Sequence, residues 1–175
     1  MEFTIRAGMT EDCKDIYRML TELSAYEKMA NQVKITQRDI EQDGFSKNPF
    51  FHSLIAEVPD QHRTKEGHAK MGCVIYFYAY STLTGRSVFM EALYVMPEFR
   101  GHGIGKALMS KVAQLGLAAG CNQLNFSVLK WNKPSLDFYH SLGCWDTTSD
   151  PEFYSMRCEG AALQSLVEGN PPKTN

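Results

Sequence analysis

The stretch Val95-Met-Pro-Glu-Phe-Arg-Gly-His-Gly-Ile-Gly-Lys106 carries the pattern Arg-x-x-Gly-x-Gly between an apolar segment, Val88–Val95, and an amphipathic segment that begins at Ile104. Glycine has no Cβ, so the backbone can adopt positive φ there and a ligand can approach closely. The first N–H groups of a helix lack intrahelical acceptors, and the helix dipole adds positive potential at the same point. This order of strand, glycine turn and helix predicts a phosphate-binding loop for a ligand that carries a pyrophosphate. The alternative is a glycine-rich turn that binds nothing.

Spacing excludes two commoner phosphate-binding loops. A Walker loop requires Gly-x-x-x-x-Gly-Lys-[Ser/Thr], but Gly105-Lys106 is followed by Ala107, and Arg100 stands in place of the first glycine. The dinucleotide fingerprint Gly-x-Gly-x-x-Gly, counted from Gly101, would need glycine at Lys106.

Length and composition predict one globular domain. The chain has 175 residues, 43% of them hydrophobic, and a net charge of −2, which argues against nucleic acid or an anionic membrane as a partner. No apolar run approaches the length of a membrane span, and no signal-peptide pattern is present. The cysteines follow no metal-binding spacing and predict reduced thiols: Cys13, Cys73, Cys121, Cys144 and Cys158. We expect a cytoplasmic protein with one domain over residues 1–168 and a frayed tail over 169–175.

Hydrophobic periodicity predicts an alternating series of strands and helices. Thr36-Gln-Arg-Asp39 resembles a capping box, Gly120 and Gly143 suit helix ends, and Pro134 suits a helix start. The expected strands cover 3–7, 50–58, 71–80, 88–95, the alternating residues Leu124, Phe126 and Val128, and Phe153–Cys158; the expected helices cover 12–27, 36–44, 104–119 and 134–142. This order gives a mixed α/β fold.

Three segments resemble one enzyme family: Asp43-Gly-Phe-Ser-Lys-Asn-Pro-Phe-Phe-His52, the glycine segment, and Trp131-Asn-Lys-Pro-Ser-Leu-Asp-Phe-Tyr139. They are similar to the diamine (spermidine/spermine) and thialysine N-acetyltransferases of the Gcn5-related superfamily. The resemblance implies the acyl-CoA N-acyltransferase fold, a single mixed, mostly antiparallel sheet with flanking helices and a V-shaped splay between its fourth and fifth strands. It also implies acetyl-CoA as co-substrate, no metal, a small-molecule amine as substrate, and a homodimer.

The resemblance assigns the cofactor site residue by residue. Backbone groups of Leu93, Tyr94 and Val95 would bind the pantetheine, and the loop would hold the pyrophosphate. The other residues that the resemblance implies in binding of acetyl-CoA are Arg100, Gly101, His102, Gly103, Ile104, Gly105, Lys106, Asn132, Lys133, Pro134, Ser135 and Tyr139. Lys106 can equally be a solvated helix residue.

Two residues carry the implied chemistry. Tyr139 matches the family's general acid near the acetyl-CoA sulfur, against the alternative of a core tyrosine beside Phe138. Glu91 is expected to bind the amine first and relay its proton second, because a nearby carboxylate favours the charged ammonium. The expected substrate residues are Tyr26, Glu27, Glu91, Asn125, Phe126 and Ser127.

Several positions depart from the polyamine enzymes. Ala92 replaces an acid on the fourth strand, Lys130 replaces an acid before the Trp-Asn motif, and Asn125 replaces a histidine. A further family acid aligns with Pro151, where Asp150 or Glu152 could substitute after a shift. A polyamine with several positive charges needs several carboxylates, so these changes favour thialysine or a lysine-like amine, whose carboxylate Lys130 could meet.

Three alternatives for the function stay open at this point. The substrate can be a diamine or polyamine, or a protein N-terminus or lysine, and the chain can be a non-catalytic acyl-CoA-binding module. The aromatic residues Trp145, Phe153 and Tyr154 can belong to a dimer interface or to the core.

Overall fold

A computed structural model describes residues 1–148, 157 and 159–167. The chain divides into two compact units, 1–129 and 130–175, and each is described here by itself. The strand expected over Phe153–Cys158, the positions of Asp150 and Glu152, and the tail over 169–175 lie outside the described residues, apart from Arg157.

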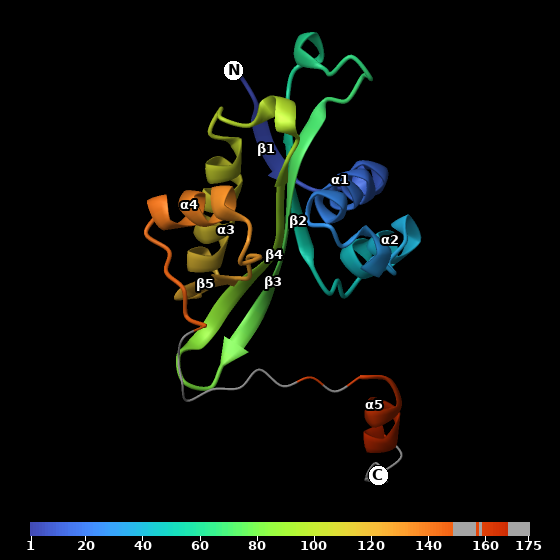
Figure 1. Cartoon of the computed structure of the whole chain (residues 1–175), viewed down its shortest axis with the longest axis vertical. Coiled ribbons are helices and arrows are strands. Elements are labelled where there is room, and N and C mark those ends of the chain that lie inside the picture. The colour runs from blue at the N-terminus through green and yellow to red at the C-terminus, as the bar shows by residue number, and fades with distance from the viewer. Residues whose placement is uncertain (149–156, 158, 168–175) are drawn as a thin grey trace. The chain divides into compact units, whose positions relative to one another are not determined.

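The first unit contains a five-stranded sheet in the order β1-β2-β3-β4-β5 (Figure 1). Neighbouring strands are antiparallel except for β4 and β5, which run parallel. The strands are β1 Thr4–Ala7, β2 His52–Glu57, β3 Lys70–Ser81, β4 Gly85–Val95 and β5 Gln123–Phe126. The mixed, mostly antiparallel sheet predicted from the sequence is therefore confirmed.

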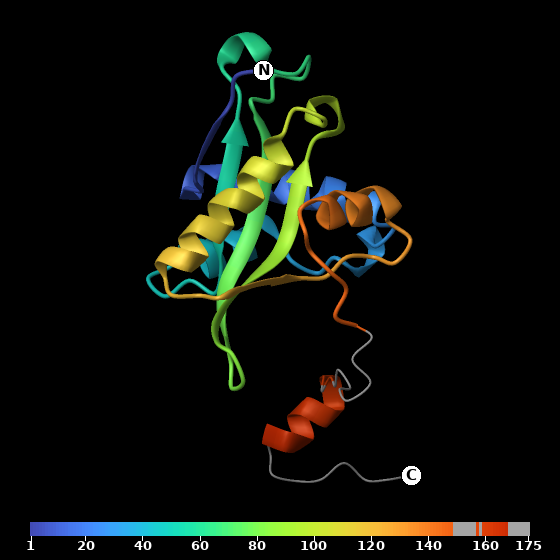
Figure 2. The same ribbon diagram turned by 90° about the vertical axis from the view of Figure 1, so that its left-hand side faces the viewer.

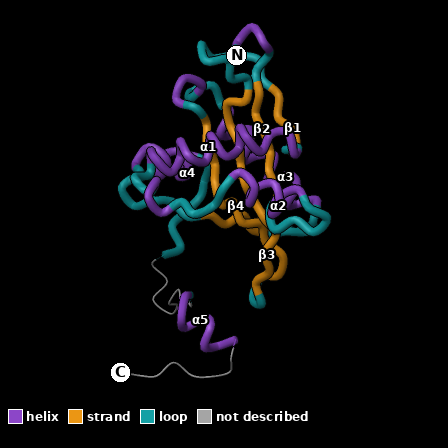
Figure 3. Tube along the Cα trace, turned by 90° about the vertical axis from the view of Figure 1, so that its right-hand side faces the viewer, coloured by secondary structure: helices purple, strands orange, loops and turns teal. Residues whose placement is uncertain are grey.

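Helices cover both faces of this sheet. In Figure 2 the helix α3 crosses the sheet in front, and Figure 3 shows α1 and α2 on the opposite face. Their bounds are α1 Cys13–Tyr26, α2 Gln37–Phe45 and α3 Ile104–Ala118, and single 3₁₀ turns η1 to η4 cover Thr10–Asp12, Ala30–Gln32, Asp60–His62 and Pro97–Phe99. The predicted capping box begins α2: the Thr36 hydroxyl accepts from the Asp39 amide at 3.3 Å, and the Asp39 carboxylate accepts from the Thr36 amide at 2.7 Å.

Apolar side chains on both faces of the central strand form the core. Ile16 of α1 and Leu108 and Val112 of α3 are fully buried against the sheet, and each such side chain stabilises the fold by roughly 1.5–3 kcal/mol. A Cβ on Gly116 would lie 3.1 Å from Val88 Cγ1, so α3 packs closely on β4 and a side chain there would require Val88 to shift slightly.

A β-bulge interrupts the pairing of β3 with β4. Tyr76 pairs with Met90 and Ile75 pairs with Ala92, which leaves Glu91 without an opposing residue. On its other side, β4 pairs with β5 only over Ser87–Met90. On the side away from β3, the residues of β4 from Glu91 to Val95 therefore have no paired strand among the described residues, which is the splay that the family resemblance implied.

The second unit contains α4 Lys133–Ser141 and α5 Gly160–Val167. The predicted helix after Pro134 is confirmed, but α5 was not predicted. One strand prediction needs correction: β5 ends at Phe126, so Val128 lies outside it.

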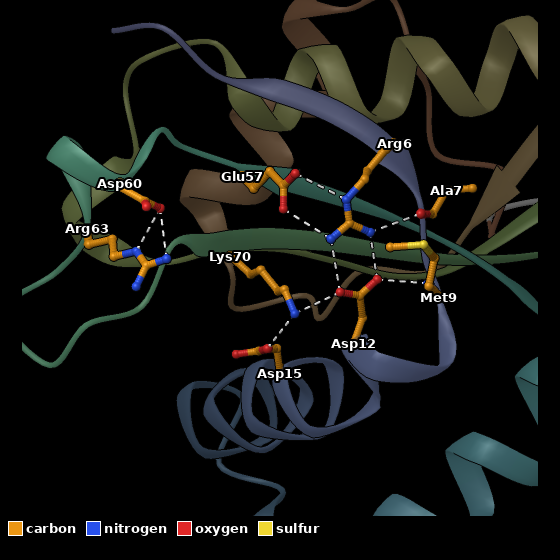
Figure 4. A network of polar contacts seen from close by, with 9 residues as sticks. All are labelled: Arg6, Ala7, Met9, Asp12, Asp15, Glu57, Asp60, Arg63 and Lys70. Atoms are coloured by element: carbon orange, nitrogen blue, oxygen red, sulfur yellow. Dashed lines mark hydrogen bonds and ion pairs between the residues drawn. The ribbon is translucent and has the colours of Figure 1, made fainter.

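Charged residues join β1, β2, β3 and the start of α1 (Figure 4). Asp12 is only 1% exposed, and its carboxylate accepts from Arg6 Nη1 at 2.6 Å and pairs with Lys70 Nζ at 2.8 Å. Arg6 also pairs with Glu57 at 3.0 Å, and Lys70 with Asp15 at 2.9 Å. Removal of this buried carboxylate would take one ion-pair partner from each of the two cations and leave each with a single acidic partner.

We predict that Asp12→Asn lowers the free energy of unfolding by about 2–3 kcal/mol, below the usual range for a buried pair because Arg6 and Lys70 are partly exposed. Hydrogen bonds from Arg6 and Lys70 hold the pKa of Asp12 well below its ordinary value, despite the opposing effect of burial. The ionised carboxylate therefore stabilises the fold above its unfolded pKa of about 3.9, and this contribution is lost as the pH falls further.

Urea unfolding of wild type and variant at pH 7 and pH 3 checks this prediction. Asp60→Asn is the control, because the exposed Asp60 carboxylate pairs with Arg63 across a single turn. The prediction would be contradicted if the difference in free energy of unfolding between wild type and Asp12→Asn were as large at pH 3 as at pH 7.

Candidate active site

The glycine loop has the backbone that the sequence predicts. Gly101 and Gly103 have φ of 79° and 81°, and Gly103 caps the start of α3 with no side-chain hydrogen bond. The first helical bond runs from the Ala107 amide to the Gly103 carbonyl at 2.9 Å, so the amides of the preceding helical residues have no intrahelical acceptor. Ile104 is buried and anchors this turn. An open loop and uncapped amides at a helix dipole fit an anionic group.

His102 stabilises the loop through backbone contacts. Its Nδ1 lies 3.0 Å from the Arg100 carbonyl and 3.2 Å from the Phe99 carbonyl. Carbonyl oxygens only accept hydrogen bonds, so Nδ1 carries the proton. Gly105 and the exposed Lys106 lie in the first turn of α3.

The open edge of β4 exposes alternate peptide groups. The Met96 amide donates to Met71 of β3 at 2.8 Å, so the peptide groups of Val95 and Leu93, one and three residues back, face away from β3. Tyr94 has its peptide on the β3 side and its side chain against α1, where the hydroxyl donates to Glu22 Oε2 at 2.7 Å. Of the three residues predicted to bind pantetheine through their backbone, Leu93 and Val95 have the suitable orientation.

Two carboxylates lie near each other where this edge begins. Glu91 occupies the bulge and is exposed, and Glu27 caps the C-terminal end of α1. The pKa of Glu27 is raised, first by burial and second by the negative charge of Glu91. Two acids that repel each other suit a cationic group between them, because its charge relieves the repulsion.

The other predicted substrate residues of the first unit lie at the end of α1 and on or just after β5. The Arg100 guanidinium carbon lies 5.4 Å from the centroid of the Tyr26 ring, the last residue of α1. On β5, Asn125 pairs with Phe89, Phe126 pairs with Met90 next to the bulge, and Ser127 follows the strand. Asn125 and Phe126 thus lie at the end of the β4–β5 ladder, where the bulge at Glu91 begins, and the substrate roles of these residues stay predictions.

The predicted residues of the second unit lie on α4. Asn132 Oδ1 accepts from the Ser135 amide at 3.4 Å and caps the helix, and Pro134 lies in its first turn. Lys133 pairs with Asp137 at 2.6 Å. The Tyr139 and Phe138 ring centroids are 5.2 Å apart. Because this unit is described by itself, the catalytic role of Tyr139 stays a prediction.

The sequence reasoning missed the polar support behind the site. Arg18 Nη1 donates to Glu22 Oε1 at 2.9 Å, and Glu22 holds the Tyr94 hydroxyl. The i,i+4 spacing of Arg18 and Glu22 on a predicted helix was the available signal. Among the described residues no cluster could hold a metal ion, and none of the described helices is both long and apolar enough to span a bilayer.

The Acetyltransferase (GNAT) family model matches residues 16–144 of this chain. The chain therefore belongs to this acetyltransferase family, and it is an N-acetyltransferase with acetyl-CoA as its co-substrate.

Similarity to individual proteins indicates the branch of the acetyltransferase family to which the chain belongs. Thialysine N-epsilon-acetyltransferase of Sus scrofa is 43% identical over 163 residues, which are 93% of this chain and 96% of that protein. Spermidine/spermine N(1)-acetyltransferase-like protein 1 of Homo sapiens is 35% identical over 94% of this chain and 24% of that protein. The solved structure of an integron cassette protein from the mobile metagenome of V. cholerae has a TM-score of 0.72 at 22% identity, covers 96% of this chain and 99% of its own, and supports the fold. Within the family, the chain belongs to the thialysine and diamine branch.

We predict that Glu27→Gln raises the melting temperature at pH 7 to 8. The unfolded Glu27 ionises more readily than the folded one, so its charge destabilises the fold above its ordinary pKa of about 4.3, and this cost vanishes at lower pH. Thermal melts of wild type and variant from about pH 3 to pH 8 measure the difference. A variant that melts below wild type at pH 7 contradicts the prediction, and the exposed Glu98→Gln is the control.

We predict that Gly103→Ala weakens binding of CoA and lowers the free energy of unfolding by about 1 kcal/mol, because a side chain is strained at positive φ. Gly67→Ala is a matched control: Gly67 has φ of 87° and, like Gly103, no atom within 4 Å of an added Cβ. It lies in the β2–β3 connection, outside the glycine loop, so it is expected to show the stability loss without the binding loss. Calorimetric titration with CoA separates the two effects, and equal CoA affinities for both variants would refute it.

Proposed function

We propose that the chain transfers the acetyl group of acetyl-CoA directly to the primary amine of thialysine or a lysine-like small molecule. The observation that carries the proposal is the pair of carboxylates, Glu27 and Glu91, at the start of the open edge of β4. The similarity to thialysine N-epsilon-acetyltransferase over 93% of the chain supports it.

In the proposed mode the co-substrate extends along β4. Its pyrophosphate binds the uncapped amides that begin α3, and its pantetheine amides bind the outward peptide groups of Leu93 and Val95. Asn132 to Ser135, at the start of α4, are the further residues expected to bind the pantetheine arm. The bound thioester supplies an activated acetyl group.

Side chains of the protein transfer two protons, one from the substrate ammonium and one to the departing sulfur. A primary ammonium has a pKa of about 10.4, so only about one molecule in a thousand is nucleophilic at neutral pH. Glu27 and Glu91 bind and orient the ammonium, and Glu91 passes its proton toward solvent. Tyr139 donates a proton to the departing sulfur. Amides at the β4 bulge stabilise the oxyanion that forms on the acetyl group.

The charges near the site favour a lysine-like amine over a polyamine. Ala92 pairs with Ile75 on the side of the sheet that faces α1, where the polyamine enzymes carry an acid. Lys130 adds a positive charge that suits the carboxylate of an amino acid and disfavours a polyamine. A diamine or polyamine remains the second candidate, because Glu27 and Glu91 also suit its terminal ammonium.

We propose a cytoplasmic homodimer as the working form. Trp145 is 79% exposed in the single chain, which favours the interface over the core for this residue.

Steady-state release of CoA from acetyl-CoA tests the function with thialysine, lysine, spermidine, putrescine and a lysine peptide. We predict the highest kcat/KM for thialysine, and a kcat for Tyr139→Phe lowered about 100-fold. Tyr80→Phe is the control, because Tyr80 lies on the β3–β4 hairpin and is 75% exposed. Clear preference for spermidine would establish the second candidate, and binding of acetyl-CoA without turnover would establish a non-catalytic module.

A further inference from the structure

A buried hydrogen bond ties α1 to the open edge of β4. The Tyr94 hydroxyl donates to Glu22 Oε2 at 2.7 Å, and Tyr94 is only 4% exposed. Its two neighbours on β4, Leu93 and Val95, have the peptide groups that face away from β3. Glu22 therefore contacts the strand exactly where the edge offers its free peptide groups.

Arg18 holds the Glu22 carboxylate in place for this bond. Its Nη1 donates to Glu22 Oε1 at 2.9 Å, so each carboxylate oxygen has its own donor. Nη2 of the same guanidinium donates to the Lys70 carbonyl at 2.9 Å, and Nη1 lies 3.6 Å from Met96 Sδ. Lys70 begins β3 and Met96 follows β4, so Arg18 and Glu22 connect the middle of α1 to both strands.

The Tyr94 hydroxyl is a fixed donor. Burial raises the pKa of Tyr94, and the hydrogen bond to Glu22 raises it further. The hydroxyl therefore keeps its proton at every pH at which acetyl transfer is measured. It can hold α1 in place, but it is unsuited to supply a proton to the reaction.

The amine-binding end of α1 follows the position of Glu22. Glu27 comes five residues after Glu22, about 7.5 Å along the helix axis. The Glu27 amide donates to the Leu23 carbonyl at 2.9 Å, which is the regular helical bond. Glu27 thus moves with the helix, and the bond between Glu22 and Tyr94 sets how far Glu27 lies from the edge of β4.

We propose that Glu22 is a positioning residue, which acts through the Tyr94 hydroxyl to hold the amine at reaction distance from the acetyl group on β4. Without this bond α1 can shift on the sheet, and the bound amine shifts with Glu27. A misplacement of about 1 Å can lower a rate about 100-fold. This inference rests on the proposed function, which places the amine at Glu27 and the acetyl group beside β4.

Tyr94→Phe tests the proposal because it removes only the hydroxyl. The ring stays, and with it the contact to the Arg100 guanidinium, whose carbon lies 5.9 Å from the ring centroid. Arg100 Nε also donates to the Val95 carbonyl at 2.9 Å, so this end of β4 keeps that support. Glu22 keeps Arg18 as its partner.

We expect kcat of Tyr94→Phe to fall about 10-fold, because the amine and the acetyl group are less well aligned. The calorimetric dissociation constant of CoA is expected to stay within about two-fold of wild type, since the backbone groups of β4 and the glycine loop are unchanged. The pH profile of kcat keeps its wild-type shape. The assay uses whichever of the amines above the wild type acetylates fastest, at a temperature at which both proteins are folded.

Variants of Glu22 show whether the two residues act through one bond. Glu22→Leu removes the acceptor, so kcat is expected to fall by at least as much as in Tyr94→Phe. Glu22→Gln keeps an oxygen that accepts from the hydroxyl, so kcat is expected to stay within about two-fold of wild type. The double variant Glu22→Leu/Tyr94→Phe is expected to be no slower than Glu22→Leu alone.

Tyr76→Phe is the matched control for loss of a tyrosine hydroxyl. Tyr76 is 6% exposed and lies on β3. Cys73, the partner of Tyr94 in the ladder, is three residues away on the same strand, so the Tyr76 side chain points to the other face of the sheet. Its kcat is expected to stay within about two-fold of wild type.

The proposal is overturned if Tyr94→Phe loses less than about three-fold in kcat, even when its melting temperature falls, because the hydroxyl then has a structural role alone. A double variant much slower than Glu22→Leu also overturns it. The proposed function fails separately, through absence of acetyl transfer from acetyl-CoA to any of the amines in the wild type.

Discussion

β5 hydrogen-bonds to β4 only as far as Met90, and the bulge at Glu91 begins where that pairing stops. A bulge adds one residue to one strand and increases the local twist. β4 stays paired with β3 beyond the bulge, shifted by one residue, whereas its pairing with β5 has ended. The peptide groups of Leu93 and Val95, which alternate with those bonded to β3, face outward with no strand of the described residues to pair with them. An unpaired edge of this kind usually invites another chain, and in the proposed mode a ligand completes the ladder here.

The first helix connects stability to chemistry. Its start is held by Asp12, which unites charges from β1 and β3 through Arg6 and Lys70. Its middle supplies Glu22 to the Tyr94 hydroxyl. Its end supplies Tyr26, over which the Arg100 guanidinium lies, and Glu27, whose pKa is raised by burial and by the charge of Glu91. A displacement of this helix would therefore change the core and both ligand sites together.

The acidic pair illustrates how a binding site can oppose stability. Burial and the charge of Glu91 both disfavour ionised Glu27 in the folded chain. A cationic substrate removes that penalty on binding, so the repulsion stored in the free protein favours the amine complex. The glycine loop is similar: the uncapped amides at the start of α3 destabilise the free helix, and an anion that accepts their hydrogen bonds would relieve this cost.

Local sequence determined the elements and the phosphate loop. Thr36 and Asp39 form a capping box within four consecutive residues. Gly101 and Gly103 adopt positive φ, a conformation that the local glycine pattern predicts. The family resemblance supplied the splay and the roles of Glu91 and Tyr139. Val128 was wrongly placed in β5, because apolar alternation continues past the point where backbone pairing ends.

Only the tertiary structure decided what depends on distant partners. The position of the bulge follows from how β3 and β4 align, and no local signal marks Glu91 as the extra residue. The acceptor of Arg100 and the partner of Tyr94 follow from packing that brings α1, β4 and η4 together. Hydrogen bonds and ion pairs form only over a few ångströms. The sequence could therefore indicate which residues belong to this site, but only the folded chain shows which of their atoms are in contact.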